Sequence, residues 1–201
     1  MPENFNGLKQ IDSLNFRNNK RQLIISYLLR LIGVVIFGLL FFLIVKNIKN
    51  NNLITLKDLL NIEIHSQPEV LSIILITADV IFVLYLHELI HALIFLLTHK
   101  QKPKIGIRGF IIFAAAPDKI LSKHQLSINA LAPITVITVI GFVLIYFIPQ
   151  NNLSWVFIPT LVNAAVSGGD FMTVVWVLKQ PKKTKFIDIG DIITAYTEIK
   201  H

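Results

Sequence analysis

The sequence predicts an all-α membrane protein, a bundle of about four transmembrane helices with a short β-like segment in the loop between the second and third helices. Hydrophobic residues make up 54% of the 201 residues, charged residues only 15%, and the mean hydropathy is +0.65. A soluble domain has about 45–50% apolar and about 25% charged residues. The chain contains no cysteine, which excludes disulfide scaffolds, cysteine zinc clusters and thiol nucleophiles.

Four apolar stretches are long enough to cross about 30 Å of hydrocarbon, which takes about 20 helical residues. The first is interrupted only by Arg30, and the third contains Pro133. The second and fourth carry ionisable side chains. We therefore expect one membrane-embedded domain over residues 1–201, with a polar N-terminal tail at 1–22, a C-terminal tail at 179–201 and spans at about 23–45, 70–98, 128–148 and 155–178.

The distribution of lysine and arginine orients the spans. The N-terminal tail has four of these residues, the second loop six and the C-terminal tail five, whereas the first loop has three and the third loop none. Because cytoplasmic loops carry the excess of basic residues, we expect a multi-pass protein of the cell membrane with both termini in the cytosol. The pI of about 9.7 follows from these residues beside the spans, so we exclude nucleic acid as a partner.

The second loop contains a segment with strand-like composition. Residues 104–113 read K-I-G-I-R-G-F-I-I-F, which is rich in β-branched and aromatic residues and too short to span the membrane. It predicts two short strands or one bent strand, with Gly106 and Gly109 at turn or bulge positions. The alternative is a loop that rests on the membrane surface.

Residues 87–91 read His-Glu-Leu-Ile-His and lie inside the second predicted span. On a helix the two histidines of this H-E-x-x-H pattern lie one turn apart on one face and can bind the same zinc ion. Glu88 then lies beside the open coordination position. There it can act as general base toward a zinc-activated water and later as general acid toward the leaving amine.

Ionisable residues inside a membrane span are costly and usually functional. His87, Glu88 and His91 are three such residues within a stretch of five. This density favours a metal site over a polar cluster that only stabilises the helix bundle. A catalytic zinc site usually has three protein ligands and one open position, so the motif requires a third ligand from elsewhere in the chain.

Asp170 is the third ligand that the predicted topology favours. It lies nine residues before the basic boundary at Lys179, as His91 lies nine residues before Lys100. In parallel spans the two side chains therefore lie at a similar depth. His124 and Asp118, in the second loop, remain alternative ligands.

The residues before Asp170 are unusually small, which allows another helix to approach closely. We expect Gly168 and Gly169 to loosen the helix, and Asn163, two turns before Asp170, to share its face. Asp79 lies about 12 Å from His87 along the helix, too far to bind the same ion. We assign it no role.

These motifs resemble the small bacterial putative zincin peptidases. The resemblance covers roughly residues 70–200, and it rests on the H-E-x-x-H motif and on residues 115–125, 163–170 and 185–191, with Tyr196. It implies a more distant likeness to site-two proteases, whose zinc is held by two histidines of one span and an aspartate of another.

By this likeness the zinc ligands are His87, His91 and Asp170, with Glu88 as the catalytic acid and base. In the wider group an asparagine before the aspartate helps to hold the substrate, and Asn163 matches that catalytic position. The chain departs from the wider group in having Phe171, where glycine usually follows the aspartate.

The sequence thus predicts a membrane-embedded zinc metallopeptidase that hydrolyses a peptide or membrane-protein substrate. The alternative is a non-catalytic metal-binding membrane scaffold protein, which has no need of Glu88 beside its ligands. A metal transporter is disfavoured, because transporters usually have internal repeats and more spans. The sequence names neither the substrate nor the oligomeric state.

Overall fold

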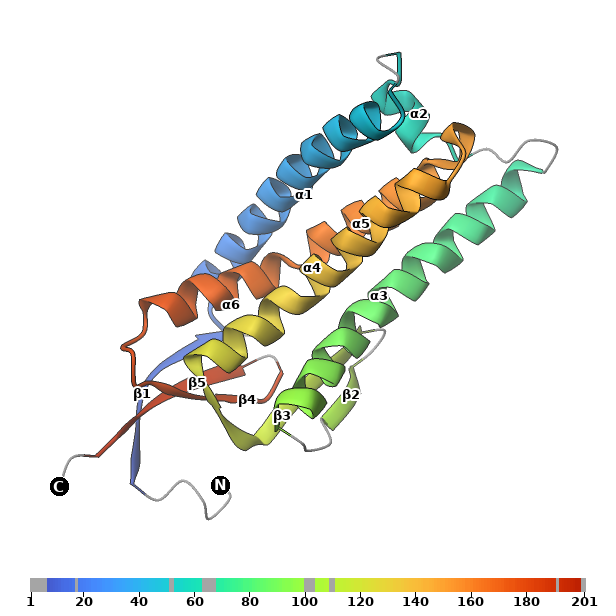
Figure 1. The fold of residues 1–201 in the computed structure, drawn as a ribbon. Coiled ribbons are helices and arrows are strands. Elements are labelled where there is room, and N and C mark those ends of the chain that lie inside the picture. The colour runs from blue at the N-terminus through green and yellow to red at the C-terminus, as the bar shows by residue number, and fades with distance from the viewer. Residues whose placement is uncertain are drawn as a thin grey trace. The chain divides into compact units, whose positions relative to one another are not determined.

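The computed structural model describes residues 7–16, 18–50, 53–62, 68–99, 104–108, 111–190 and 192–199. These residues are mostly helical, with a small antiparallel sheet (Figure 1). The helices are α1 (Lys20–Ile48), α2 (Leu56–Leu60), α3 (Glu69–His99), α4 (Lys123–Phe147), the 3-10 helix η2 (Gln150–Asn152), α5 (Ser154–Val166) and α6 (Gly168–Lys179). The strands are β1 (Leu8–Asn15), β2 (Lys104–Arg108), β3 (Ile111–Ser122), β4 (Lys185–Asp188) and β5 (Ile192–Glu198).

Three helices, α1, α3 and α4, are long and apolar enough to cross a membrane. They coincide with the first three predicted spans to within five residues at each end. The fourth predicted span is a bent pair rather than one helix, because residues 150–166 and 168–179 meet at an angle of 41°.

The bend falls at Ser167, immediately before the predicted weak point at Gly168 and Gly169. The Ser167 hydroxyl donates a hydrogen bond of 2.9 Å to the carbonyl of Asn163, and the Ser167 amide donates to the same oxygen at 3.1 Å. Glycine has a low helix propensity, so two glycines at this point favour the break. Helix α6 therefore begins only two residues before Asp170.

The sheet is larger than the sequence predicts, and the chain is not all-α. Its five strands have the order β1-β5-β4-β3-β2, and each neighbouring pair is antiparallel. The predicted β-like segment at 104–113 corresponds to β2 and the start of β3, whereas residues 109 and 110 lie outside the described residues. The other three strands come from the two tails, where we expected no strand.

By its internal contacts the chain divides into two compact units, whose boundaries fall inside continuous helices. The first unit comprises Met1–Leu29, Glu88–Ala132 and Gly169–His201 and contains the whole sheet. The second comprises Arg30–His87 and Pro133–Gly168.

Each unit has its own apolar core. The core of the first unit joins the sheet to α3, α4 and α6, and its buried members are Leu14, Phe95, Leu121, Leu126, Met172, Trp176, Val177, Phe186, Ile193 and Ala195. The core of the second unit joins α1, α2, α4 and α5, and consists of Phe41, Val45, Ile54, Leu59, Ile145, Leu153, Val156 and Phe157.

Candidate metal centre

Helix α3 carries the H-E-x-x-H motif on a continuous helical turn. His87 and His91 are buried, with only 4% and 9% of each residue exposed, while Glu88 is half-buried. A buried imidazole normally has a hydrogen-bond partner. The structure provides one for each ring, from a different helix in each case.

His87 is oriented by an amide side chain of α5. Its Nδ1 atom lies 2.8 Å from Oδ1 of Asn163, a residue with no exposed surface. An amide oxygen only accepts hydrogen bonds, so this contact requires the proton of the neutral ring to be on Nδ1. The lone pair of the neutral His87 ring is then on Nε2, the arrangement that is usual for metal-binding histidines.

His91 is oriented in the same way by Asn129 of α4. Its Nδ1 atom lies 3.0 Å from the backbone oxygen and 3.1 Å from the side-chain oxygen of Asn129. In return, Nδ2 of Asn129 donates a hydrogen bond of 2.9 Å to the backbone oxygen of His91. Because a backbone carbonyl can only accept, the Nδ1 proton is again fixed and Nε2 is left for another partner.

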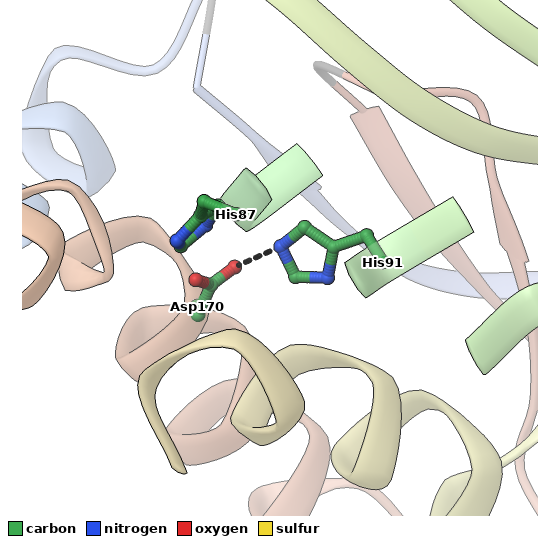
Figure 2. A group of neighbouring side chains, drawn as sticks. All are labelled: His87, His91 and Asp170. Carbon is green, nitrogen blue, oxygen red and sulfur yellow. Dashed lines mark ion pairs between the residues drawn. The ribbon is translucent and has the colours of Figure 1, made fainter. Parts of the chain in front are cut away.

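Asp170, in the first turn of α6, is the residue that meets the two histidines. Its Oδ1 atom lies 3.4 Å from Nε2 of His91. One ligand atom from each of His87, His91 and Asp170 can be chosen so that all three lie within 4.8 Å of one another. Figure 2 shows the three side chains converging, with the two histidines on successive turns of one helix.

This geometry fits a zinc ion. Ligand atoms at about 2.0–2.1 Å from a tetrahedral zinc are about 3.4 Å apart, which is the separation between His91 and Asp170. Two imidazoles and a carboxylate are also a common ligand set for catalytic zinc. Each histidine has a neutral oxygen partner on Nδ1, so the outer hydrogen bonds of a metal site are already in place.

A second buried carboxyl lies in the electrostatic environment of this group. Asp188, at the end of β4, is 8% exposed, and its Oδ1 accepts a hydrogen bond of 2.7 Å from the Gly190 amide. Burial raises the pKa of Asp188 to about 7, partly offset by the Gly190 hydrogen bond and by His91, while Asp170 and Glu88 raise the pKa further. Sequence reasoning assigned Asp188 no place at the site, because nothing local connects a tail residue with α3.

The other candidates are not part of this group in the described residues. His124 is exposed at the start of α4, and Asp79 is half-buried in α3, two turns from His87. Asp118 belongs to β3, but its side chain lies outside the described part of the chain.

Asn163 does not lie on one continuous helix with Asp170. We expected it to share a helix face with that residue, but α5 ends at Val166 and α6 begins at Gly168. Its contact is instead with His87. Asn129, which the sequence analysis did not select, accepts a hydrogen bond from His91 in the same way. The sequence feature that could have identified it is a single amide side chain inside an apolar span.

A comparison with protein families matches residues 80–185 to the family described as "Putative zincin peptidase". The matched region contains the H-E-x-x-H motif, Asn129, Asn163 and Asp170, and it ends before Asp188. Searches of curated proteins and of solved structures gave no match to the chain.

Proposed function

Because this chain belongs to the putative zincin peptidase family, we propose that it is a membrane-embedded zinc metallopeptidase whose metal ligands are His87, His91 and Asp170. The observation that carries the proposal is the convergence of these three ligand atoms within 4.8 Å. The hydrogen bonds to both Nδ1 atoms add support, because they place the ring proton on Nδ1 and the lone pair, with which a histidine coordinates a metal, on Nε2.

The zinc ion, when bound, supplies Lewis-acid activation of a water molecule and of the scissile carbonyl group. Glu88 is the proton carrier of the reaction. Its carboxylate takes a proton from the attacking water and later gives it to the leaving nitrogen. Its place next to His87 in the motif supports this role, as does the half-buried position of its side chain.

Asn163 has a second function in this proposal, which is to hold the peptide. Its Oδ1 atom is engaged by His87, whereas its buried Nδ2 atom has no hydrogen-bond partner among the described residues. A buried amide donor without a partner is unfavourable. A carbonyl oxygen of a bound peptide would satisfy this donor.

The substrate must be extended, because a helix hides its carbonyl groups in hydrogen bonds. Strand β2 is the last strand in the order of the sheet, so its outer edge can pair with an extended peptide by strand addition. We propose that a peptide or a segment of a membrane protein binds there before cleavage.

We further propose that the protein is a multi-pass protein of the cell membrane with four crossings and both termini in the cytosol. Three helices are each long and apolar enough to cross a membrane, and the α5–α6 pair is long and apolar enough when it is counted as one bent span. Strand β1 precedes α1, and its partner β5 follows α6. Their pairing requires an even number of crossings, which supports counting the bent pair as the fourth.

The decisive experiment compares the wild-type protein with Glu88→Gln in detergent, using unfolded peptides and candidate membrane proteins as substrates. Glutamine keeps the shape of the side chain but cannot carry the proton, so cleavage should be abolished while zinc is retained. Glu69→Gln is the matched control, because Glu69 is an exposed carboxylate at the other end of α3 and its loss should change neither measurement.

The outcomes separate the candidate functions. Cleavage lost only in Glu88→Gln, with zinc unchanged, supports the peptidase. Equal cleavage by all three proteins indicates a contaminating protease. Zinc binding without cleavage of any substrate by the wild-type protein would replace the peptidase with a metal-binding scaffold.

A further inference from the structure

Helix α6, which carries Asp170 in its first turn, is held near its other end by the N-terminal strand. The Oδ2 atom of Asp12 in β1 accepts two hydrogen bonds, one from α6 and one from the residue that directly follows it. One comes from Nε1 of Trp176 at 2.8 Å, and the other comes from Nε2 of Gln180 at 2.7 Å. Trp176 lies in the last turn of α6, and Gln180 directly follows the last helical residue, Lys179.

The local structure of β1 explains why Asp12 points toward α6. The pairing of β1 with β5 shifts register between Gln10 and Asp12, so Ile11 is the extra residue of a bulge. Beyond the bulge, side chains alternate between the two faces of the strand. Asp12 thus shares a face with Leu14, which is fully buried in the same apolar core as Trp176.

Trp176 is a rigid point of contact between the helix and the sheet. Its side chain is 7% exposed, and its ring packs edge-on against Phe186 of β4 with ring centroids 5.6 Å apart. The indole cannot turn without losing both this packing and the hydrogen bond to Asp12. Trp176 lies six residues after Asp170, which is about 9 Å along the helix axis. Any rotation of α6 that moves the indole also moves the Asp170 carboxylate.

We propose that Asp12 is a positioning residue for the metal centre, which fixes the rotation of α6 and thereby the position of the Asp170 carboxylate relative to His91. This inference rests on the proposed role of Asp170 as a metal ligand. It makes the N-terminal strand a support of the proposed metal site, although β1 lies about 75 residues before the H-E-x-x-H motif.

The test measures metal binding rather than cleavage. Wild-type protein, Asp12→Ala and Asp12→Asn are stripped of metal in detergent and titrated with Co2+, whose visible spectrum reports the geometry of its ligands. Asp12→Ala should lower the Co2+ affinity about tenfold, at the lower end of the effect of residues that orient metal ligands, and should change the spectrum. Asp12→Asn should restore both, because its amide oxygen can still accept the two hydrogen bonds.

Two further variants separate positioning from a general loss of stability. Glu198→Gln removes a carboxylate from the same sheet, where Glu198 pairs with Lys185 at 2.7 Å, and it should leave Co2+ binding unchanged. Trp176→Phe removes the donor but keeps an aromatic ring, so it provides a test from the helix side if Asp12→Ala does not fold. Thermal unfolding of the metal-free variants identifies any that are simply unfolded.

Wild-type Co2+ affinity and spectrum in both Asp12→Ala and Trp176→Phe would overturn the inference. Equal losses in Asp12→Ala and Glu198→Gln would also overturn it, because the effect would then be a general one on the sheet. Absence of Co2+ binding by the wild-type protein would instead refute the proposed metal centre, and with it this inference.

Discussion

A buried histidine can bind a metal only if the ring nitrogen that faces the ion keeps its lone pair. In this protein the position of the ring proton is fixed by an oxygen atom that accepts a hydrogen bond from Nδ1. This oxygen belongs to Asn163 for His87 and to Asn129 for His91. Each asparagine is itself buried, so its position is fixed by packing. Each imidazole is therefore already held in one orientation, so it would lose little side-chain entropy if it bound a metal.

At the residue scale, replacing Asp170 should weaken zinc binding, whereas replacing His124 should not. Asp170→Ala removes a carboxylate that lies 3.4 Å from Nε2 of His91, and a zinc site with two protein ligands binds far more weakly than one with three. Zinc affinity, measured by competition with a chelator, should fall at least about a hundredfold, beyond the usual effect of outer residues. His124→Ala changes an exposed residue outside the group and should leave the affinity unchanged. The reverse pattern would move the third ligand to the start of α4.

Asp188 predicts a pH dependence of stability in the metal-free protein. Burial raises the pKa of its carboxyl to about 7, against about 3.9 for an unfolded chain. Between these values the folded state holds a proton that the unfolded state has lost. The free energy of unfolding therefore falls as pH rises from about 4 to about 7, and this loss is complete above about 7.

Asp188→Asn should flatten that dependence, because asparagine cannot ionise but can still accept the hydrogen bond from the Gly190 amide. Thermal unfolding of chelator-treated protein at a series of pH values between 4 and 8 measures the difference between the two proteins. Parallel curves for wild type and variant would show that Asp188 ionises normally in the folded protein.

At the scale of elements, α4 and α5 approach each other closely within one unit. A β-carbon added at Gly141 of α4 would lie 2.8 Å from Oγ1 of Thr160 in α5 and 3.4 Å from the ring of Phe41 in α1. Real β-carbons do not approach other atoms as closely as 2.8 Å, so the contact with Thr160 is the one that excludes a side chain. The absence of a side chain at Gly141 therefore sets the distance between these two helices, as is common for small residues in membrane bundles.

Gly141→Ala should therefore destabilise the protein by about 1–3 kcal/mol, the usual cost of overpacking. Thermal unfolding in detergent measures this change. Gly169→Ala is the control, because its β-carbon would meet no atom within 4 Å, and it should be neutral or slightly stabilising. In the double variant Gly141→Ala/Thr160→Ala the combined loss should be smaller than the sum of the single losses. Additive losses would show that Thr160 does not limit the contact.

Sequence patterns predicted those features of the structure that depend on residues close together in the chain. The three unbroken spans follow from the length of their apolar runs, and the pair of histidines follows from the helical repeat. Strand β1 was missed because only Leu14 of its eight residues is buried, so it shows no alternation of apolar and polar residues. Its partner β5 lies about 180 residues away. Asn129 was missed for the same reason, since its partner His91 is 38 residues distant.

At the scale of the whole molecule, the sheet joins three parts of the chain, which lie before, between and after the apolar helices in the sequence. Strand β1 precedes α1, β2 and β3 connect α3 to α4, and β4 and β5 follow α6. Strands in one sheet must lie on the same side of a membrane. The N-terminal tail, the second loop and the C-terminal tail, which contain these strands, carry fifteen of the nineteen lysine and arginine residues of the chain. Charge and strand pairing are thus independent observations that support the same topology.

The topology can be tested directly, because the chain has no native cysteine that would give a background. Single cysteines at four exposed positions, Gln10, Lys57, Asn151 and Lys183, are treated in intact cells with a maleimide that does not cross the membrane. We expect labelling at Lys57→Cys and Asn151→Cys, since the proposed topology places both positions outside the cell, on the side of the membrane opposite the sheet. Gln10→Cys and Lys183→Cys should react only after permeabilisation, since the proposed orientation places β1 and the residues before β4 in the cytosol. If Asn151→Cys reacts with the same requirement as Lys183→Cys, the α5–α6 pair does not cross the membrane and the four-crossing topology fails. If all four reactivities are reversed, the number of crossings holds, and only the orientation assigned from the basic residues is wrong.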